Sequence, residues 1–240
     1  TNCLNFGNPE NPEIMGEFAE CVQGIKESCE FLNFPVVSGN VSFYNGTNNK
    51  NIFPTPVIGG VGLIKNLKKT LNHNFQREKS IILLVGKTFG HLGQSVFLSE
   101  IHSITDGPPP DINLTNEKNN GEAVIKIIEK NLINSAHDVS SGGLILTLAE
   151  MAIHSKIGIK ISKPKKLSNI FEYFFGEDQG RYVIEINQDK LTLVEKILKE
   201  NNVFYEQIGV TQKNNFELTG EFKLDLLDLY NINNQWYYKY

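Results

Sequence analysis

The chain has 240 residues, of which 40% are hydrophobic and 21% charged, and its formal net charge at pH 7 is −4. This length suits one large domain or two modest ones, and the apolar content is ordinary for a globular protein. The acidic balance argues against a nucleic-acid-binding protein, and no apolar run approaches the ~18 residues that a membrane-spanning helix needs.

The N-terminal part combines turn-forming and apolar segments. In chain order, we expect a polar turn at 1–9, a helix from Pro12 to about Leu32, a strand beginning at Val36, a loop of turn formers at 45–49 and a buried strand at 54–64. The helix has the clearest signals, because Asn11 can cap it and Pro12 suits its first position. Apolar residues then recur at spacings of three and four, which is typical of a helix with one buried face.

A domain boundary is predicted between Lys65 and Lys79, where charged and amide residues replace the apolar pattern. Beyond it, we expect strands at 80–86, 181–186 and 204–210 and helices at 92–101, 117–129, 140–154 and 190–201. The strand at 80–86 is expected to be central, since its apolar run is uninterrupted. Helices and strands intermix without strict alternation, which favours an α+β fold over a doubly wound sheet.

Three cysteines, Cys3, Cys21 and Cys29, cannot all pair within the chain. None has the spacing of a zinc ligand, so we expect reduced thiols and a cytoplasmic protein. The chain begins at Thr1 without an initiator methionine, and polar residues suited to a site follow at once. We therefore expect it to be the C-terminal piece of a longer protein.

The segment Val36–Asn45 is the most informative part of the sequence, because two β-branched residues lead into a small polar turn. Gly39 would let the backbone touch a ligand, Asn40 offers a carbonyl oxygen for a magnesium shell, and Ser42 can bind a phosphate or amide. A plain β-hairpin turn is the alternative. The opening turn offers further amides ahead of a helix, or satisfies its own backbone. Together the two turns suggest half of a nucleotide site.

Two later segments carry candidate chemistry. His137 precedes a helix entrance that Asp138 or Ser140 could cap, and a structural role there is favoured over a general base, since the sequence places no partner carboxylate beside it. The run Glu177–Arg181 combines two carboxylates, Gln179 and a guanidinium. Acid–base or metal chemistry and an internal ion pair with Arg181 remain equal alternatives.

Five motifs together resemble one family, phosphoribosylformylglycinamidine synthase, in order from Thr1 to about Val210. They are Asn2–Glu10, Val37–Ser42, Pro54–Gly59, Ser135–Ser140 and Glu177–Arg181. The resemblance, to the C-terminal half of the synthetase subunit, implies an aminoimidazole-ribonucleotide synthetase-like fold. It implies a partial second N-terminal α/β domain at 1–66, a second C-terminal α+β domain at 67–215, and a tail at 216–240 that can add edge strands.

The resemblance also implies an activity. The family converts formylglycinamide ribonucleotide (FGAR), ammonia derived from glutamine and ATP to the amidine, ADP and phosphate in de novo purine biosynthesis. By motif, Asn2 and Gly39 match ATP contacts, Asn40 a Mg²⁺ ligand and Ser42 a substrate contact. Relatives often carry Asp where this chain has Asn2. The family's catalytic residues fall outside this chain, so implied partners are the missing N-terminal half of the synthetase, a glutaminase subunit and a small accessory subunit.

Two alternatives remain open from the sequence. The chain could be a non-catalytic scaffold half with a structural nucleotide site, to which the Glu177–Arg181 motif would belong. It could instead serve another member of the superfamily, with selenophosphate or thiamine-phosphate chemistry, although the run Asn5–Pro9 speaks against this. Under the ligase hypothesis, the chain alone is expected to have negligible synthetase turnover, because it needs the other half of the protein.

Overall fold

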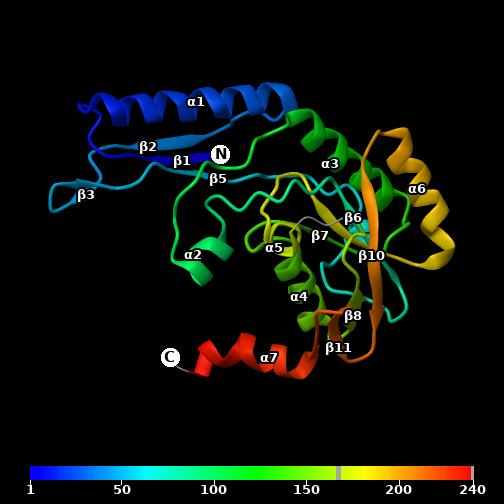
Figure 1. Cartoon of the computed structure of the whole chain (residues 1–240). Helices are drawn as coiled ribbons and strands as arrows, with labels where there is room; N and C mark the ends of the chain where they lie inside the picture. Colours follow the sequence, from blue (N-terminus) through cyan, green and yellow to red (C-terminus); the bar gives the residue numbers. More distant parts are fainter. Residues whose placement is uncertain (166–168, 239–240) are drawn as a thin grey trace. The chain divides into compact units, whose positions relative to one another are not determined.

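The computed structural model describes residues 1–165 and 169–238 (Figure 1). The chain divides into two compact units, Thr1–Lys65 and Asn66–Tyr240, and each is described here by itself. Among the described residues, no helix combines the length and the apolar character needed to cross a membrane.

The N-terminal unit contains a three-stranded sheet in the order β2-β1-β5. β1 runs parallel to β2 and antiparallel to β5, while β3 and β4 form a small separate hairpin. The elements are β1 (Asn2–Asn5), α1 (Pro12–Leu32), β2 (Gly39–Ser42), β3 (Gly46–Thr47), β4 (Lys50–Asn51) and β5 (Thr55–Ile58). The long helix α1 runs along one face of the sheet (Figure 1).

Helix α1 confirms the sequence prediction at both ends. The side chain of Asn11 accepts a hydrogen bond from the backbone N–H of Glu13, and Pro12 occupies the first turn. At the C-terminal end, Asn33 adopts a left-handed conformation (φ 54°), and its N–H caps the last carbonyls. The inner face of α1 packs on a small core made of Leu4, Phe6 and Ile14, flanked by Phe18, Cys21, Ile25 and Phe43.

Four predictions for this unit are wrong. Residues 2–5 of the expected opening turn form strand β1, and the expected strand at 54–64 is reduced to Thr55–Ile58. The strand expected to begin at Val36 begins at Gly39, so the expected polar turn at 39–42 is itself strand β2. The strand at 54–64 was also expected to be buried, yet Val57 and Ile58 of β5 are 55% and 59% exposed. The reason is topological, because β2 and β5 are the two edges of a three-stranded sheet, which sequence periodicity cannot reveal.

The C-terminal unit is built on a seven-stranded mixed sheet in the order β12-β11-β8-β10-β6-β9-β7. Its strands are β6 (Ile81–Val85), β7 (Ser135–Asp138), β8 (Gly158–Ile161), β9 (Tyr182–Ile186), β10 (Tyr205–Gln212), β11 (Asn215–Leu218) and β12 (Phe222–Asp225). Only the β11–β8 pairing is parallel; all other described pairings in this sheet are antiparallel. The predicted central strand is confirmed, since every residue of β6 is buried.

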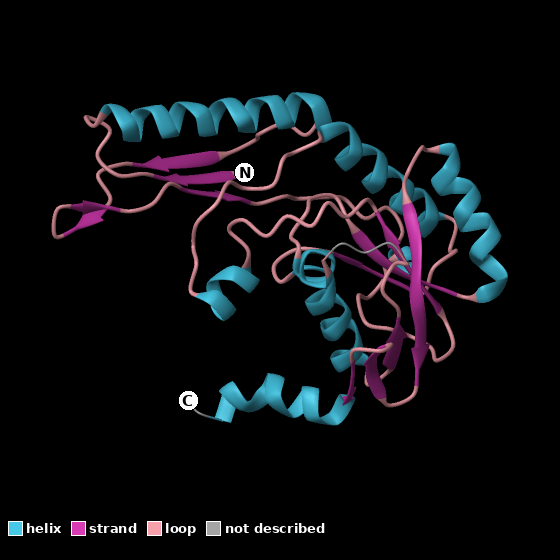
Figure 2. Cartoon of the chain, viewed as in Figure 1, coloured by secondary structure: helices cyan, strands magenta, loops and turns pink. Residues whose placement is uncertain are grey.

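Helices cover both faces of this sheet (Figure 2). The helices are α2 (Val96–His102), α3 (Leu114–Glu129), α4 (Gly143–Ser155), α5 (Ile170–Phe175), α6 (Leu191–Glu200) and α7 (Leu226–Asn234), with short 3₁₀ turns η1 (Leu67–Lys69), η2 (Gln188–Lys190) and η3 (Gln235–Tyr238). Successive side chains of β6 point to opposite faces of the sheet and pack into two separate hydrophobic cores. Ile82 and Leu84 pack with α4 and α5, whereas Ile81, Leu83 and Val85 pack with α3 and α6.

The four helices expected in this unit are confirmed, with ends shifted by a few residues, as are the strands near 181–186 and 204–210. Sequence analysis missed β7, β8, α5 and α7. The two strands are only four residues long, so neither shows a clear alternation of apolar and polar residues. α5 has only six residues, four of them aromatic, which is too short for a helical apolar spacing to stand out. The mixed helix and sheet content confirms the α+β class.

Candidate functional site

The four residues expected to bind ligands lie on two neighbouring strands of the N-terminal unit. β1 and β2 are paired in parallel, so that Asn2 stands beside Gly39 and Asn5 beside Ser42. Two segments separated by more than thirty residues of sequence are therefore adjacent, and α1 joins them in a β–α–β connection. The structure thus brings together the two segments that the sequence singled out, as paired strands and not as turns.

Gly39 is required for the contact with Asn2. A Cβ atom built on Gly39 would lie 2.0 Å from Asn2 Oδ1, 2.9 Å from Asn2 Cγ and 3.1 Å from the Asn2 carbonyl oxygen. No L-residue with a side chain fits there unless Asn2 moves. The amide of Asn2 consequently rests directly over the backbone of β2, and both residues present polar groups at one place.

The strands separate the four residues into two pairs. Successive side chains on a strand point to opposite faces, and Leu4 on β1 packs toward α1. Asn2 and Gly39 therefore lie on the same face of the sheet as Leu4. Asn40 and Ser42 project from the opposite face. β2 is an exposed edge strand, so a ligand can reach both pairs only by passing around that edge. The four residues were expected to form one cluster, because the sequence does not reveal on which face of the sheet each side chain lies.

Asn40 by itself does not make a magnesium site. Its side chain can supply one carbonyl oxygen, while Mg²⁺ needs an octahedral oxygen shell in which carboxylates are usual. Within the described residues, no group of three or more His, Cys, Asp or Glu side chains could hold a metal ion. The residues present therefore do not fit a complete site, and further ligands would have to come from phosphate oxygens or another polypeptide segment.

In the C-terminal unit, the carboxylates of the Glu177–Arg181 motif organise loops. Asp178 is buried and accepts hydrogen bonds from the backbone N–H groups of Phe89 (3.0 Å), Gly90 (2.9 Å) and His91 (3.1 Å). Glu177 Oε1 accepts from the N–H groups of Val96 (2.8 Å) and Gly142 (2.7 Å), at the starts of α2 and α4. Both carboxylates are thus committed to backbone donors.

Arg181 completes this arrangement as a buried cation, with 1% of its surface exposed. Its guanidinium donates to the carbonyls of Asp178 and Gly176 and to Thr88 Oγ1, and Nη2 lies 3.9 Å from Asp178 Oδ2. Burial lowers the pKa of Arg181, and the neighbouring Asp178 opposes that shift. Of the two alternatives, the structure supports the internal ion pair over acid–base or metal chemistry.

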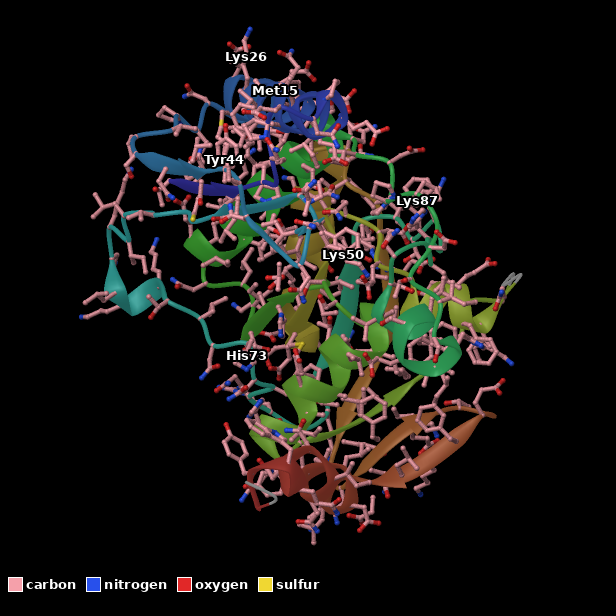
Figure 3. All side chains as sticks on the ribbon, turned by 90° about the vertical axis from the view of Figure 1, so that its left-hand side faces the viewer. Met15, Lys26, Tyr44, Lys50, His73 and Lys87 are labelled. Carbon is pink, nitrogen blue, oxygen red and sulfur yellow. The ribbon has the colours of Figure 1, made fainter. Side chains whose placement is uncertain are left out.

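His137 lies on β7, and it has carboxylate partners that the sequence did not reveal. Its Nδ1 is 3.2 Å from Asp138 Oδ1, and its Nε2 is 3.1 Å from Glu150 Oε2 on α4. The ring of His73, labelled in Figure 3, lies 5.2 Å from that of His137 and 5.7 Å from that of His154. Burial and these two imidazoles lower the pKa of His73, while Glu150 raises it.

The capping expected at α4 is wrong. Its N-cap residue is Gly142 in a left-handed conformation (φ 80°), without a side-chain hydrogen bond. Glu177, distant in sequence, accepts the Gly142 N–H in place of the Asp138 or Ser140 side chain. Because the cap comes from another element, local sequence could not indicate it. His137 itself lies on β7, ahead of the turn that leads into α4.

Comparison with known proteins places these features in a family. Residues 77–220 match the model of the AIR synthase related protein, C-terminal domain, and residues 1–64 match that of the N-terminal domain. The chain belongs to the AIR synthase-related protein family. It is 51% identical over 240 residues to phosphoribosylformylglycinamidine synthase subunit PurL of Pelagibacter ubique, covering all of this chain and 33% of that protein. The chain thus spans about a third of the length of the curated relatives it matches.

Solved structures show the same AIR synthase-related fold. PurL of Thermotoga maritima complexed with FGAR matches 95% of this chain and 39% of its own, with a TM-score of 0.68 and 15% identity. The same protein has been solved with ATP and as PurLQS, each with a TM-score of 0.65. The hydrogenase maturation protein HypE also matches, with a TM-score of 0.63 and 14% identity over 94% of this chain and 74% of its own. The predicted fold and family resemblance are confirmed.

One residue of the site escaped sequence analysis. Asn45 was placed in a loop of turn formers, yet its side chain contacts both the main chain and the hydroxyl of Ser42. The signal available in the sequence was the spacing Ser42-x-x-Asn45 in a turn, since asparagine side chains there commonly bond to nearby backbone. That signal does not distinguish Asn45 from Asn48 or Asn49 of the same loop.

Proposed function

We propose that this chain is part of a PurL-type phosphoribosylformylglycinamidine synthase. The reaction is the ATP-dependent conversion of FGAR and ammonia, released from glutamine, to the amidine, ADP and phosphate in cytoplasmic de novo purine biosynthesis. The observation that carries the proposal is 51% identity to a PurL over all 240 residues. The AIR synthase-related fold alone would not carry it, since HypE shares that fold.

The chemistry explains what such a site must do. An amide carbonyl is a poor electrophile, so ATP phosphorylates its oxygen to give an iminophosphate, which ammonia then displaces with release of phosphate. Positioned donors and cations favour the transition state by offsetting the charge on the transferring phosphoryl group. In this proposal the chain supplies binding and orientation, and the catalytic residues lie elsewhere in the protein.

Asn2 and Gly39 are proposed as ATP contacts. Gly39 carries no side chain, and the Asn2 amide lies against its backbone, so a phosphate or ribose oxygen can approach β2 closely at this point. Asn2 offers both an N–H donor and a carbonyl acceptor but no charge. A neutral asparagine does not repel a triphosphate, whereas the aspartate of many relatives would. Asn2 also does not offset the negative charge of the phosphates, so we expect the cations that do so elsewhere in the protein.

Asn40 and Ser42 are proposed to face the substrate side of the sheet. Asn40 would supply one oxygen ligand to Mg²⁺, which when bound would neutralise phosphate charge, and the remaining ligands would come from ATP and the rest of the protein. Ser42 would donate its hydroxyl to FGAR. Such a site is incomplete within this chain, and we propose that the other half of the synthetase completes it, with a glutaminase and a small accessory subunit as partners.

The test replaces Asn40 and Ser42 with alanine in the natural-length protein. Formation of the amidine from FGAR, ATP and ammonia is measured, and assembly is followed by size-exclusion chromatography. The control is Asn49→Gly, because Asn49 is exposed in the same hairpin, adopts a left-handed conformation that glycine shares, and makes no hydrogen bond to any described residue. We expect turnover to be lost in Asn40→Ala and the KM for FGAR to rise in Ser42→Ala with turnover still measurable, while assembly stays intact in both variants. Unchanged turnover would favour the scaffold alternative instead.

A further inference from the structure

The side chain of Asn45 joins the ends of β1 and β2. Its Nδ2 lies 3.0 Å from the carbonyl oxygen of Phe6, 3.0 Å from that of Ser42 and 3.1 Å from Ser42 Oγ. Its backbone N–H also donates to Phe6 O (3.2 Å). Asn45 and Ser42 are both half-buried, so these bonds are partly protected from water. One amide therefore fixes the point at which both strands leave the sheet.

These contacts determine which way the amide faces. A carbonyl oxygen can only accept a hydrogen bond, so the NH₂ group of Asn45 must point at Phe6 O and Ser42 O. Ser42 Oγ can accept a shared hydrogen bond from Asn45 Nδ2 (3.1 Å), and the acceptor for the hydrogen of the Ser42 hydroxyl is Asn45 Oδ1, at 3.3 Å. This is long compared with the usual O–H···O distance of about 2.7–2.8 Å. The hydroxyl is consequently oriented but weakly held, and a better acceptor on a ligand can replace Asn45 Oδ1.

The backbone between the two residues is strained in a way that supports this arrangement. Tyr44, labelled in Figure 3, has a φ of 59°, which bulky residues rarely adopt. Its N–H donates to Gly7 O (2.9 Å), and the turn folds Asn45 back onto Ser42. Strained residues of this kind persist where surrounding contacts enforce them, and they concentrate at functional sites.

The hairpin β3–β4 holds Asn45 from its other side. The Asn45 carbonyl accepts from the N–H of Ile52 (3.2 Å), and Asn51 Oδ1 accepts from the N–H of Asn8 (3.0 Å). A Cβ on Gly7 would lie 2.6 Å from Asn51 Cβ, so the opening segment and the hairpin are in close contact. Asn45 is thus fixed through its side chain, its N–H and its carbonyl.

We propose that Asn45 is a positioning residue, which directs the Ser42 hydroxyl toward the ribonucleotide substrate. The proposal rests on the proposed function and adds to it a residue that does not touch the reacting atoms. Asn45 acts through Ser42, so its contribution disappears once the Ser42 hydroxyl is removed. A merely structural asparagine would instead affect stability and both substrates alike.

The experiment is a double-mutant cycle in the natural-length protein, with Ser42→Ala, Asn45→Ala and the combined variant. Asn49→Gly serves as the control. We expect Asn45→Ala to raise the KM for FGAR about tenfold, the equivalent of one lost hydrogen bond, while the KM for ATP changes less than about twofold. The combined variant should be no worse than Ser42→Ala, because the two changes remove one interaction.

Two results would overturn the positioning role: an Asn45→Ala enzyme indistinguishable from Asn49→Gly, or effects of Ser42→Ala and Asn45→Ala that multiply. If Asn45→Ala does not fold, Asn45→Ser retains one hydroxyl donor and replaces it in the cycle under the same criteria. Failure of the proposed function looks different, since the wild-type protein itself would then form no amidine from FGAR.

Discussion

Replacing Asp178 with asparagine tests whether the Glu177–Arg181 motif is a structural element. The carboxylate accepts from Phe89 and Gly90 through Oδ2 and from His91 through Oδ1. In Asp178→Asn, the amide oxygen can keep the first two bonds, now uncharged, but the NH₂ group must face the N–H of His91. One half-buried donor is left unpaired, and Arg181 loses its nearby charge.

The magnitude follows from these losses. An unpaired buried donor costs about 1–3 kcal/mol, and hydrogen bonds to charged acceptors exceed neutral ones by about 1 kcal/mol each. We expect the free energy of unfolding to fall by about 3 kcal/mol in total, less than the 3–5 kcal/mol of a fully broken buried pair, since the amide keeps two contacts. With a urea m-value of about 2 kcal/mol/M, the midpoint should fall by about 1.5 M.

The assay is urea unfolding of residues 1–240 followed by far-UV circular dichroism. Asp111→Asn is the matched control, because Asp111 is exposed and makes no hydrogen bond to any described residue. Since the chain has two units, the two transitions should be fitted separately. A midpoint for Asp178→Asn within about 0.3 M of the Asp111→Asn value would refute the structural role assigned to this carboxylate.

Two further predictions concern pH and the nucleotide contact. Burial, His137 and His154 lower the pKa of His73 below its ordinary value of about 6.5, so stability is present above that value and lost as pH falls through it. His73→Gln should therefore flatten the decline of Tm between pH 7.5 and 5.5, and an unchanged slope would contradict this cause. In the natural-length protein, Gly39→Ala should push aside the Asn2 side chain and raise the KM for ATP about tenfold or more. An unchanged KM for ATP would remove this pair from the nucleotide site.

The elements that could be predicted are those whose signals are local. α1 has a capping asparagine, a proline in its first turn and a regular apolar spacing, and all three act within the helix itself. β6 is an uninterrupted apolar run, which only a strand buried on both faces explains. By contrast, β1 was taken for a turn, because Asn2 and Asn5 flank only two apolar residues and its pairing with β2 and β5 makes it a strand.

The features that escaped prediction depend on contacts between distant segments. Glu185 is fully buried with no cationic partner among the described residues, and its oxygens accept from the N–H groups of Gln76 and Arg77 and from the Ser135 hydroxyl. No local sequence pattern predicts that a glutamate will be fully buried. The division of the candidate site between two faces of β2 depends likewise on strand parity and register, which become known only with the pairing.

We propose that this chain holds one wall of an ATP-dependent amidine-forming site, which another part of the protein completes. The most direct test of this proposal is to measure turnover of FGAR, ATP and ammonia by purified residues 1–240, beside the natural-length protein at equal concentration. We expect no amidine above background from the chain alone and steady turnover from the longer protein. Robust amidine formation by residues 1–240 by themselves would contradict the account.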